Sequence, residues 1–136
     1  MIREIIHDPL LLARKSGPAT EKDLAIAADL KDTLLANRDR CVGMAANMIG
    51  ELKRIIVVSN GLIPMILINP EITGRSGEYT AEEGCLSLAG TRRAKRWQEI
   101  TVRYRDESFR THISTFRGFT AQIIQHECDH CEGILI

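Results

Sequence analysis

The sequence predicts an α+β fold, in which a mixed or antiparallel sheet packs around a C-terminal helix and another helix lies near the N-terminus. Two observations predict this class. Helical periodicity is confined to the two ends of the chain, and the middle consists of short β-branched or alternating runs. Parallel βαβ units would instead alternate strands with helices along the whole chain.

The first helix is predicted over residues 21–37. The chain is interrupted before it at Ser16-Gly17-Pro18. Thr20 then precedes Asp23 by three residues, a spacing related to the capping box found at helix starts. The apolar side chains that follow at helical spacing are Ile26, Leu30 and Leu34. We expect this helix to be scaffold.

Strands are predicted in the middle of the chain. Residues 54–58 form a short β-branched run that leads into a turn at residues 59–61. A second strand, residues 65–68, is expected to stop at Asn69-Pro70.

Two further strands and the last helix follow. Residues 100–105 alternate apolar and polar side chains, the pattern of a strand with one buried face. Residues 111–116 are expected to form the next strand. Gly118 then opens a helix that runs to about Cys131 and ends near Gly133.

Size and charge narrow the class of protein. A chain of 136 residues suits one domain, residues 1–136, with one core. Its 18 basic and 18 acidic residues cancel, so no overall field favours direct contact with nucleic acid or an anionic membrane. A short basic run is interpreted as a solvated face. Its members are Arg92, Arg93, Lys95 and Arg96.

Neither a membrane span nor a signal peptide is predicted. No apolar segment reaches the roughly 20 residues that cross a bilayer, and His7-Asp8-Pro9 interrupts the N-terminal segment. We therefore expect a cytoplasmic protein in a reducing compartment, where cysteines stay as thiols. Cysteines near histidines then favour metal binding over disulfides. The four cysteines are Cys41, Cys85, Cys128 and Cys131.

The strongest chemical signal lies in the predicted C-terminal helix, where residues 125–130 contain the pattern H-E-x-x-H. His126 and His130 are about 40° apart around a helix that advances about 100° per residue, so both imidazoles can hold one metal ion. Glu127 lies about 60° from His130 and can reach a water on that ion as general base. Asp129 either orients a ligand or an arginine, or is simply exposed.

A catalytic site of this kind needs a third protein ligand and one open position. The cysteines and the acidic side chains are candidates. Cys128 is about 160° from His130, and Cys131 is awkwardly placed at about 100°, so both are expected to be small buried apolar side chains. Cys85 follows Gly84, which lets the backbone come close to a ligand, so the pattern alone favours Cys85 modestly over the other candidates.

Three motifs make the sequence resemble the peptide deformylases. Residues 83–87 match the E-G-C-L-S motif of that family in full, and residues 125–130 match Q-H-E-x-D-H in full. The first family motif, G-x-G-x-A-A-x-Q followed by Ile-Gly, appears over residues 41–50 as C-V-G-M-A-A-N-M-I-G. Residues 5–10 are also similar to the start of the family, so the resemblance covers nearly the whole chain.

The resemblance implies a metal-dependent hydrolase that removes the N-formyl group from N-formylmethionyl peptides of nascent proteins. Cys85, His126 and His130 would bind one divalent ion, Fe²⁺ in the cell, with Zn²⁺ or Ni²⁺ able to replace it. A water at the open position would attack the formyl carbon, and Glu127 would pass protons to the leaving amine. The backbone N–H of Leu86 would stabilise the oxyanion.

The resemblance also implies how substrate binds. The family holds its peptide as an added strand, with the methionine side chain in an apolar pocket. The positions implied to contact substrate are Val42, Gly43, Gly84, Leu86 and Ile123. For Val42, Leu86 and Ile123 an ordinary core position is an equally good interpretation. The resemblance implies nascent chains as partners, and it allows the ribosome as a further partner.

Two positions depart from the family motif. Met48 stands where the family has a glutamine whose side chain stabilises the oxyanion. A thioether cannot donate a hydrogen bond, and the loss of one such donor costs about 10²–10³ in rate. Asn47 carries an amide one residue earlier, but this offset is expected to point it elsewhere. Cys41 replaces a glycine, which is unfavourable if that position needs a positive φ.

Three alternatives stay open at this point. A deformylase-like protein with an intact metal site but little turnover would act as a peptide-binding module, and Met48 and Cys41 motivate this reading. The H-E-x-x-H pattern alone would also allow another metal-dependent amidase or a small metalloprotease. A structural zinc site on Cys128 and Cys131 is disfavoured, because those thiols face away from the histidine pair.

Overall fold

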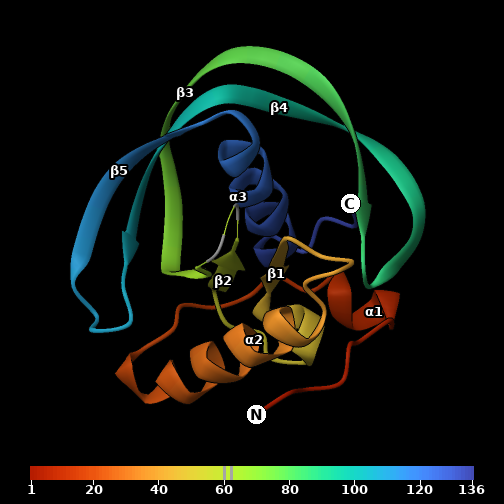
Figure 1. The fold of residues 1–136 in the computed structure, drawn as a ribbon, viewed down its shortest axis with the longest axis vertical. Helices are drawn as coiled ribbons and strands as arrows, with labels where there is room; N and C mark the ends of the chain where they lie inside the picture. Colours follow the sequence, from red (N-terminus) through yellow and green to blue (C-terminus); the bar gives the residue numbers. More distant parts are fainter. Residues whose placement is uncertain (60, 62) are drawn as a thin grey trace.

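The computed structural model describes residues 1–59, 61 and 63–136, and it has the predicted α+β class (Figure 1). The elements in chain order are α1 (Pro9–Leu12), the 3₁₀ turn η1 (Glu21–Asp23), α2 (Leu24–Ala36), β1 (Gly43–Ala45), the 3₁₀ turn η2 (Ala46–Ile49), β2 (Ile55–Val58), β3 (Met65–Cys85), β4 (Leu88–Arg105), β5 (Thr111–Arg117) and α3 (Gly118–Cys131). None of the helices among the described residues is long and apolar enough to cross a membrane.

The sheet is antiparallel throughout, which decides between the two arrangements that the sequence allowed. Its strand order is β1-β2-β3-β4-β5, and each neighbouring pair runs antiparallel. The long strands β3 and β4 arch around α3, and β5 continues the sheet on the far side of β4 (Figure 1). The C-terminal helix is therefore enclosed by the sheet, as predicted.

Strand β2 separates two apolar clusters. Successive side chains of a strand point to opposite faces. Ile55 and Val57 pack into a cluster that contains Leu30 and Leu34 of α2, whereas Ile56 and Val58 pack into the cluster that contains α3. All four residues of β2 are buried, which explains its unbroken apolar sequence.

The N-terminal helix agrees with its prediction, apart from a 3₁₀ first turn. The Thr20 side chain accepts a hydrogen bond from the first turn, and the Asp23 carboxylate accepts from the Thr20 backbone at 2.8 Å, which completes a capping box. Leu30 and Leu34 are fully buried, and Ile26 is partly buried beside them. This helix serves as scaffold.

The prediction that the second strand stops at Asn69-Pro70 is wrong. The strand continues to Cys85, but its register with β4 shifts between Ile68 and Glu71, and it changes partner there from β2 to β4. Asn69 has a φ of 51°, and its side-chain amide bonds the backbone of Ala19 at 2.8 and 2.9 Å. A proline within such an irregularity removes no ladder hydrogen bond.

The two later strands are confirmed, and one of them is much longer than predicted. The predicted strand 100–105 is the last third of β4, and residues 111–116 agree with β5. The unpredicted part is the outer β3–β4 ribbon, which is largely exposed and polar and so lacks a clear alternation. The predicted turn at residues 59–61 includes Asn60, which lies outside the described residues.

Candidate metal centre and active site

Helix α3 brings the H-E-x-x-H residues to the inner side of the arch. Its apolar residues Ala121, Ile124, Cys128 and Cys131 pack into the cluster shared with the sheet. The two cysteines are 8% and 1% exposed, so their predicted role as small buried side chains is confirmed. His126 and His130 point in another direction, toward the end of β3.

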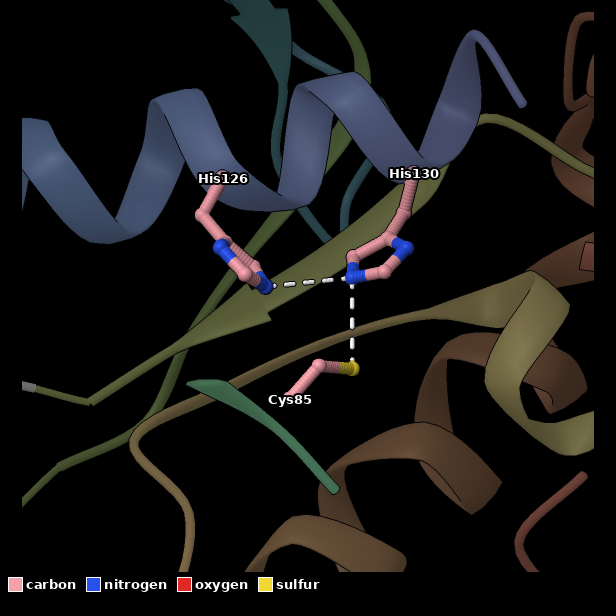
Figure 2. A group of neighbouring side chains, drawn as sticks. All are labelled: Cys85, His126 and His130. Carbon is pink, nitrogen blue, oxygen red and sulfur yellow. Dashed lines mark hydrogen bonds between the residues drawn. The ribbon is translucent and has the colours of Figure 1, made fainter. Parts of the chain in front are cut away.

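Cys85, His126 and His130 come together in one group (Figure 2). Their ligand atoms all lie within 4.8 Å of one another. The two Nε2 atoms are 3.1 Å apart, and the Cys85 Sγ atom is 3.3 Å from the Nε2 atom of His130. Among the candidates for a third ligand, the structure thus places Cys85 beside the histidine pair.

The group fits a metal ion by its geometry and by its chemistry. Tetrahedral bonds of about 2.1 Å to nitrogen and 2.3 Å to sulfur place ligand atoms roughly 3.4–3.6 Å apart. Two of the three pairs, at 3.1 and 3.3 Å, are close to this spacing. One thiolate and two imidazoles suit zinc, iron or nickel rather than magnesium or calcium. Three protein ligands also leave the open position that a catalytic site needs.

A buried ionic network orients His126. The His126 Nδ1 atom lies 2.8 Å from Oε1 of Glu83. Arg96 donates to both Glu83 oxygens at 2.7 and 2.9 Å and to Asp129 at 2.8 Å. Gln122 donates to Glu83 at 2.9 Å. A carboxylate that holds Nδ1–H leaves Nε2 free to bind a metal.

The network corrects one prediction and decides another. Arg96 is 3% exposed, so it does not belong to a solvated face, although Arg93 and Lys95 are exposed. Alternation along β4 turns Arg96 inward toward α3 and turns Arg93 and Lys95 outward. Asp129 orients an arginine, one of the two roles considered for it. Sequence reasoning missed the roles of Glu83 and Arg96, although Glu83 lies within a recognised motif.

The charges of the network follow from these contacts. Burial raises the pKa of Glu83, but hydrogen bonds from His126 and Arg96 outweigh it and lower the pKa to about 2. Burial opposes the charged form of His126, but hydrogen bonds with Cys85 and Glu83 raise its pKa to about 10. Burial and the charge of His126 lower the pKa of His130 to about 3. Glu83 is therefore ionised at neutral pH, next to His126.

Glu127 is buried beside the metal group and has fewer hydrogen-bond partners than Glu83. It is 4% exposed, and its Oε1 atom has no hydrogen-bond partner among the described residues. Burial is the main reason why its pKa rises to about 7. A carboxyl group with this pKa can both accept and donate a proton near neutral pH.

Cys85, His126 and Glu127 line one cavity of about 550 Å³. His130 is fully buried beside Cys85 and His126. All five positions implied to contact substrate also lie on its wall, namely Val42, Gly43, Gly84, Leu86 and Ile123. The segment before β1 forms one side, the end of β3 forms the other, and α3 forms the base. Arg40, Phe119 and Gln122 line it too, and no motif had indicated them.

Gly43 lies so close to α3 that no side chain fits there. A Cβ atom at this position would be 2.6 Å from Cγ2 of Ile123 and 3.0 Å from Oε2 of Glu127. We predict that Gly43→Ala displaces Glu127, lowers activity and costs about 1–3 kcal/mol of stability, measured by urea denaturation beside kinetic assays. Gly74→Ala is the control, since its Cβ would make ordinary contacts of 3.6 Å. Equal behaviour of the two variants would contradict this expectation.

The departures from the family motif have structural consequences. Met48 is 1% exposed and belongs to the cluster against which Cys85 and Leu86 pack. Asn47 is fully buried, and its amide donates to the backbone carbonyl of His130 at 3.0 Å. The expectation that Asn47 points elsewhere is therefore confirmed, and neither side chain replaces the glutamine as an oxyanion donor.

Cys41 is accommodated without backbone strain. It is not among the described residues with positive φ, so the glycine of the family is not needed there. Its thiol donates to the carbonyl of Gly43 at 2.8 Å. Burial raises the pKa of Cys41 to about 12, which keeps the thiol protonated as a donor.

The fold and the site define a class of protein: a hydrolase built on an H-E-x-x-H helix, with a Cys-His-His group for one metal ion and a glutamate beside it. Comparisons with known proteins agree. The family model for polypeptide deformylase matches residues 2–136. A peptide deformylase of Clostridium beijerinckii is 51% identical over 136 residues and covers 100% of both chains.

Solved structures give the same answer. A peptide deformylase from Legionella pneumophila is 33% identical, with a TM-score of 0.89 over 99% of this chain and 83% of that chain. One from Thermotoga maritima is 30% identical, with a TM-score of 0.88 over 99% and 95% of the chains. The chain belongs to the peptide deformylase family. Because its relatives are named as enzymes, the alternative of a peptide-binding module without turnover is not favoured, nor is a metalloprotease.

Proposed function

We propose that this chain hydrolyses the formamide bond of N-formylmethionyl peptides with one divalent ion held by Cys85, His126 and His130. The observation that carries this assignment is that the three ligand atoms come together and that two of the ligands, Cys85 and His126, line one cavity with Glu127. A relative from Acinetobacter baumannii, 27% identical, was solved with Met-Ala-Ser bound, which supports a peptide as the occupant of this cavity.

Each residue of the site has a separate role in the hydrolysis. A divalent ion, when bound, polarises the formyl carbonyl and acidifies a water. Glu127 accepts a proton from the attacking water and donates it to the amine nitrogen as the C–N bond breaks, which releases formate and a free N-terminus. Glu83 holds the His126 ring in place, and the backbone N–H of Leu86 donates to the developing oxyanion.

The cavity walls suit an extended peptide. β1 is an edge strand of the sheet, so a peptide can add along its free side. In this arrangement Val42 and Gly43 contact the peptide from one side, and Gly84 and Leu86 contact it from the other. Ile123 at the base of the cavity lies against the methionine side chain.

The donor set and the substrate suggest the cellular setting. A thiolate with two imidazoles is compatible with Fe²⁺ as the resident ion and with Zn²⁺ or Ni²⁺ as substitutes. N-formylmethionyl chains arise during protein synthesis, so we place the reaction in the cytoplasm, on nascent chains at the ribosome. Reduced thiols, as a cytoplasmic location would maintain, are required for Cys85 to bind metal.

The direct test is formate release from a formyl-Met tripeptide by anaerobically prepared protein loaded with iron or nickel. We expect metal-dependent turnover that a chelator abolishes and that added metal restores. Absence of formate with every metal form would sink the proposal.

Met48 offers a test of the oxyanion site. We predict that Met48→Gln increases kcat by up to about 10²-fold, because it restores a donor of the kind that stabilises an oxyanion. The buried amide is expected to cost about 1–3 kcal/mol of stability if it finds no partner. Met48→Leu is the matched control, since it keeps the apolar volume and adds no donor. If folded Met48→Gln is no faster than Met48→Leu, another group already completes the oxyanion site.

A further inference from the structure

The open end of the cavity carries an arginine that no motif explains. Arg40 lines the cavity and is exposed, whereas the neighbouring Arg38 and Asp39 do not line it. The other charged side chains on the wall are Glu82, Glu83, His126 and Glu127. The last three lie at the metal group, so that among the described wall residues Arg40 and Glu82 are the charged side chains left at the mouth.

Arg40 is held in position by the end of helix α2. Its Nη2 atom donates to Oδ1 of Asn37 at 2.7 Å, and its backbone N–H donates to the Asn37 carbonyl at 2.9 Å. Asn37 is 9% exposed and in turn donates to the carbonyl of Thr33 at 2.8 Å. No carboxylate pairs with Arg40 among the described residues. Its guanidinium is thus pre-positioned with donors to spare.

The geometry of the wall indicates which residue of a bound peptide lies next to Arg40. Gly43 lies against Glu127 at the reacting end, and residues 44–46 beyond it are buried and do not line the cavity. A peptide that pairs with this segment therefore continues from Gly43 toward Arg40. Three strand residues cover about 10 Å at roughly 3.3 Å each, which brings the third residue of the peptide alongside Arg40.

Glu82 does not cancel the charge of Arg40. It lies on the opposite wall, and the β3–β4 register places it directly across from Arg93. Opposite charges that face each other across an antiparallel pair attract and partly neutralise each other. The mouth is therefore left with the unpaired positive charge of Arg40.

We propose that Arg40 forms a carboxylate-binding subsite that favours formyl-peptides with Asp or Glu as the third residue and disfavours Lys or Arg there. This inference rests on the proposed function, because it assumes that the peptide N-terminus lies at the metal group. It adds a preference for substrate class that depends on one residue. An exposed charge pair of this kind is worth a few-fold in affinity.

The experiment compares formyl-Met-Ala-Glu-amide, formyl-Met-Ala-Gln-amide and formyl-Met-Ala-Lys-amide on the metal-loaded protein. The terminal amide removes the competing carboxylate of the peptide itself. We expect kcat/KM for the Glu peptide to exceed that for the Lys peptide by about 3- to 10-fold, mainly through KM, and the ratio to shrink in 0.5 M salt, where the Debye length is only about 4 Å. Arg40→Glu should reverse the preference, and Arg40→Gln should abolish it.

Arg38→Glu is the matched control, because it makes the same change of charge two residues away on an exposed side chain that does not line the cavity. It should leave the Glu-to-Lys ratio as it is in the unaltered protein. The proposal is overturned if the unaltered protein has the same kcat/KM for the Glu and Lys peptides, or if Arg40→Glu leaves their ratio unchanged. If no peptide releases formate, the proposed function fails, and calorimetric binding of the same three peptides to the unaltered protein and Arg40→Gln decides on the subsite separately.

Discussion

Glu127→Gln is expected to reduce kcat for formyl-peptide hydrolysis by about 10²–10⁴-fold, the usual contribution of a general acid–base group. Glutamine has nearly the same shape but cannot take a proton from water or return one to the leaving amine. Because burial raises the pKa of Glu127 to about 7, a neutral side chain suits this site. The variant should therefore fold normally and keep the Cys85, His126 and His130 group intact.

The measurement pairs initial rates of formate release with the metal content of the purified protein. Metal content should equal that of the unaltered protein, so that the loss lies in kcat alone. Glu132→Gln is a suitable control, because Glu132 comes directly after the same helix and its carboxylate, among the described residues, forms ion pairs near the surface with Arg54 and Lys15, which contribute little. A Glu127→Gln protein that keeps its metal and more than a tenth of the rate would contradict the assigned role.

The chemistry of the site could be predicted from the sequence because it depends on local spacing. His126, Glu127 and His130 lie within two turns of one helix, and helical geometry alone fixes their relative directions. Cys85 lies 41 residues before His126 in the chain, so spacing alone could not select it. The resemblance to the deformylases could, and the structure then placed it 3.3 Å from His130.

The ionic network of Glu83 and Arg96 beside the metal group could not be predicted from the sequence, for a different reason. Glu83 and Arg96 meet because the register of β3 with β4, together with the alternation of side chains along each strand, points both toward α3. That register follows from a ribbon whose outer half is polar and exposed, so no apolar alternation marks it in the sequence. A surface arginine and a buried one look the same in a basic run, and only the sheet distinguishes Arg96 from Arg93.

Arg96→Met is expected to destabilise the protein by about 3–5 kcal/mol, the cost of breaking a buried ion pair by removal of one partner. The side chains of Arg96 and Glu83 are 4% and 6% exposed, so the remaining carboxylate would be left in a site that water scarcely reaches. His126 and Gln122 would still donate to it, which keeps the cost within this range. Urea denaturation of the metal-free protein measures the effect apart from metal binding.

Arg93→Met is the control, because Arg93 is an exposed neighbour on the same strand and its loss should change stability by no more than about 0.5 kcal/mol. Glu83→Gln in the Arg96→Met background removes the stranded charge, so the double variant should be more stable than Arg96→Met alone. The same change takes the carboxylate from His126, and loss of such a partner typically lowers metal affinity about 10- to 100-fold. Stability recovered together with weaker metal binding would show that Glu83 orients the ligand and that Arg96 makes its buried charge tolerable. Arg96→Met no less stable than Arg93→Met would rule this out.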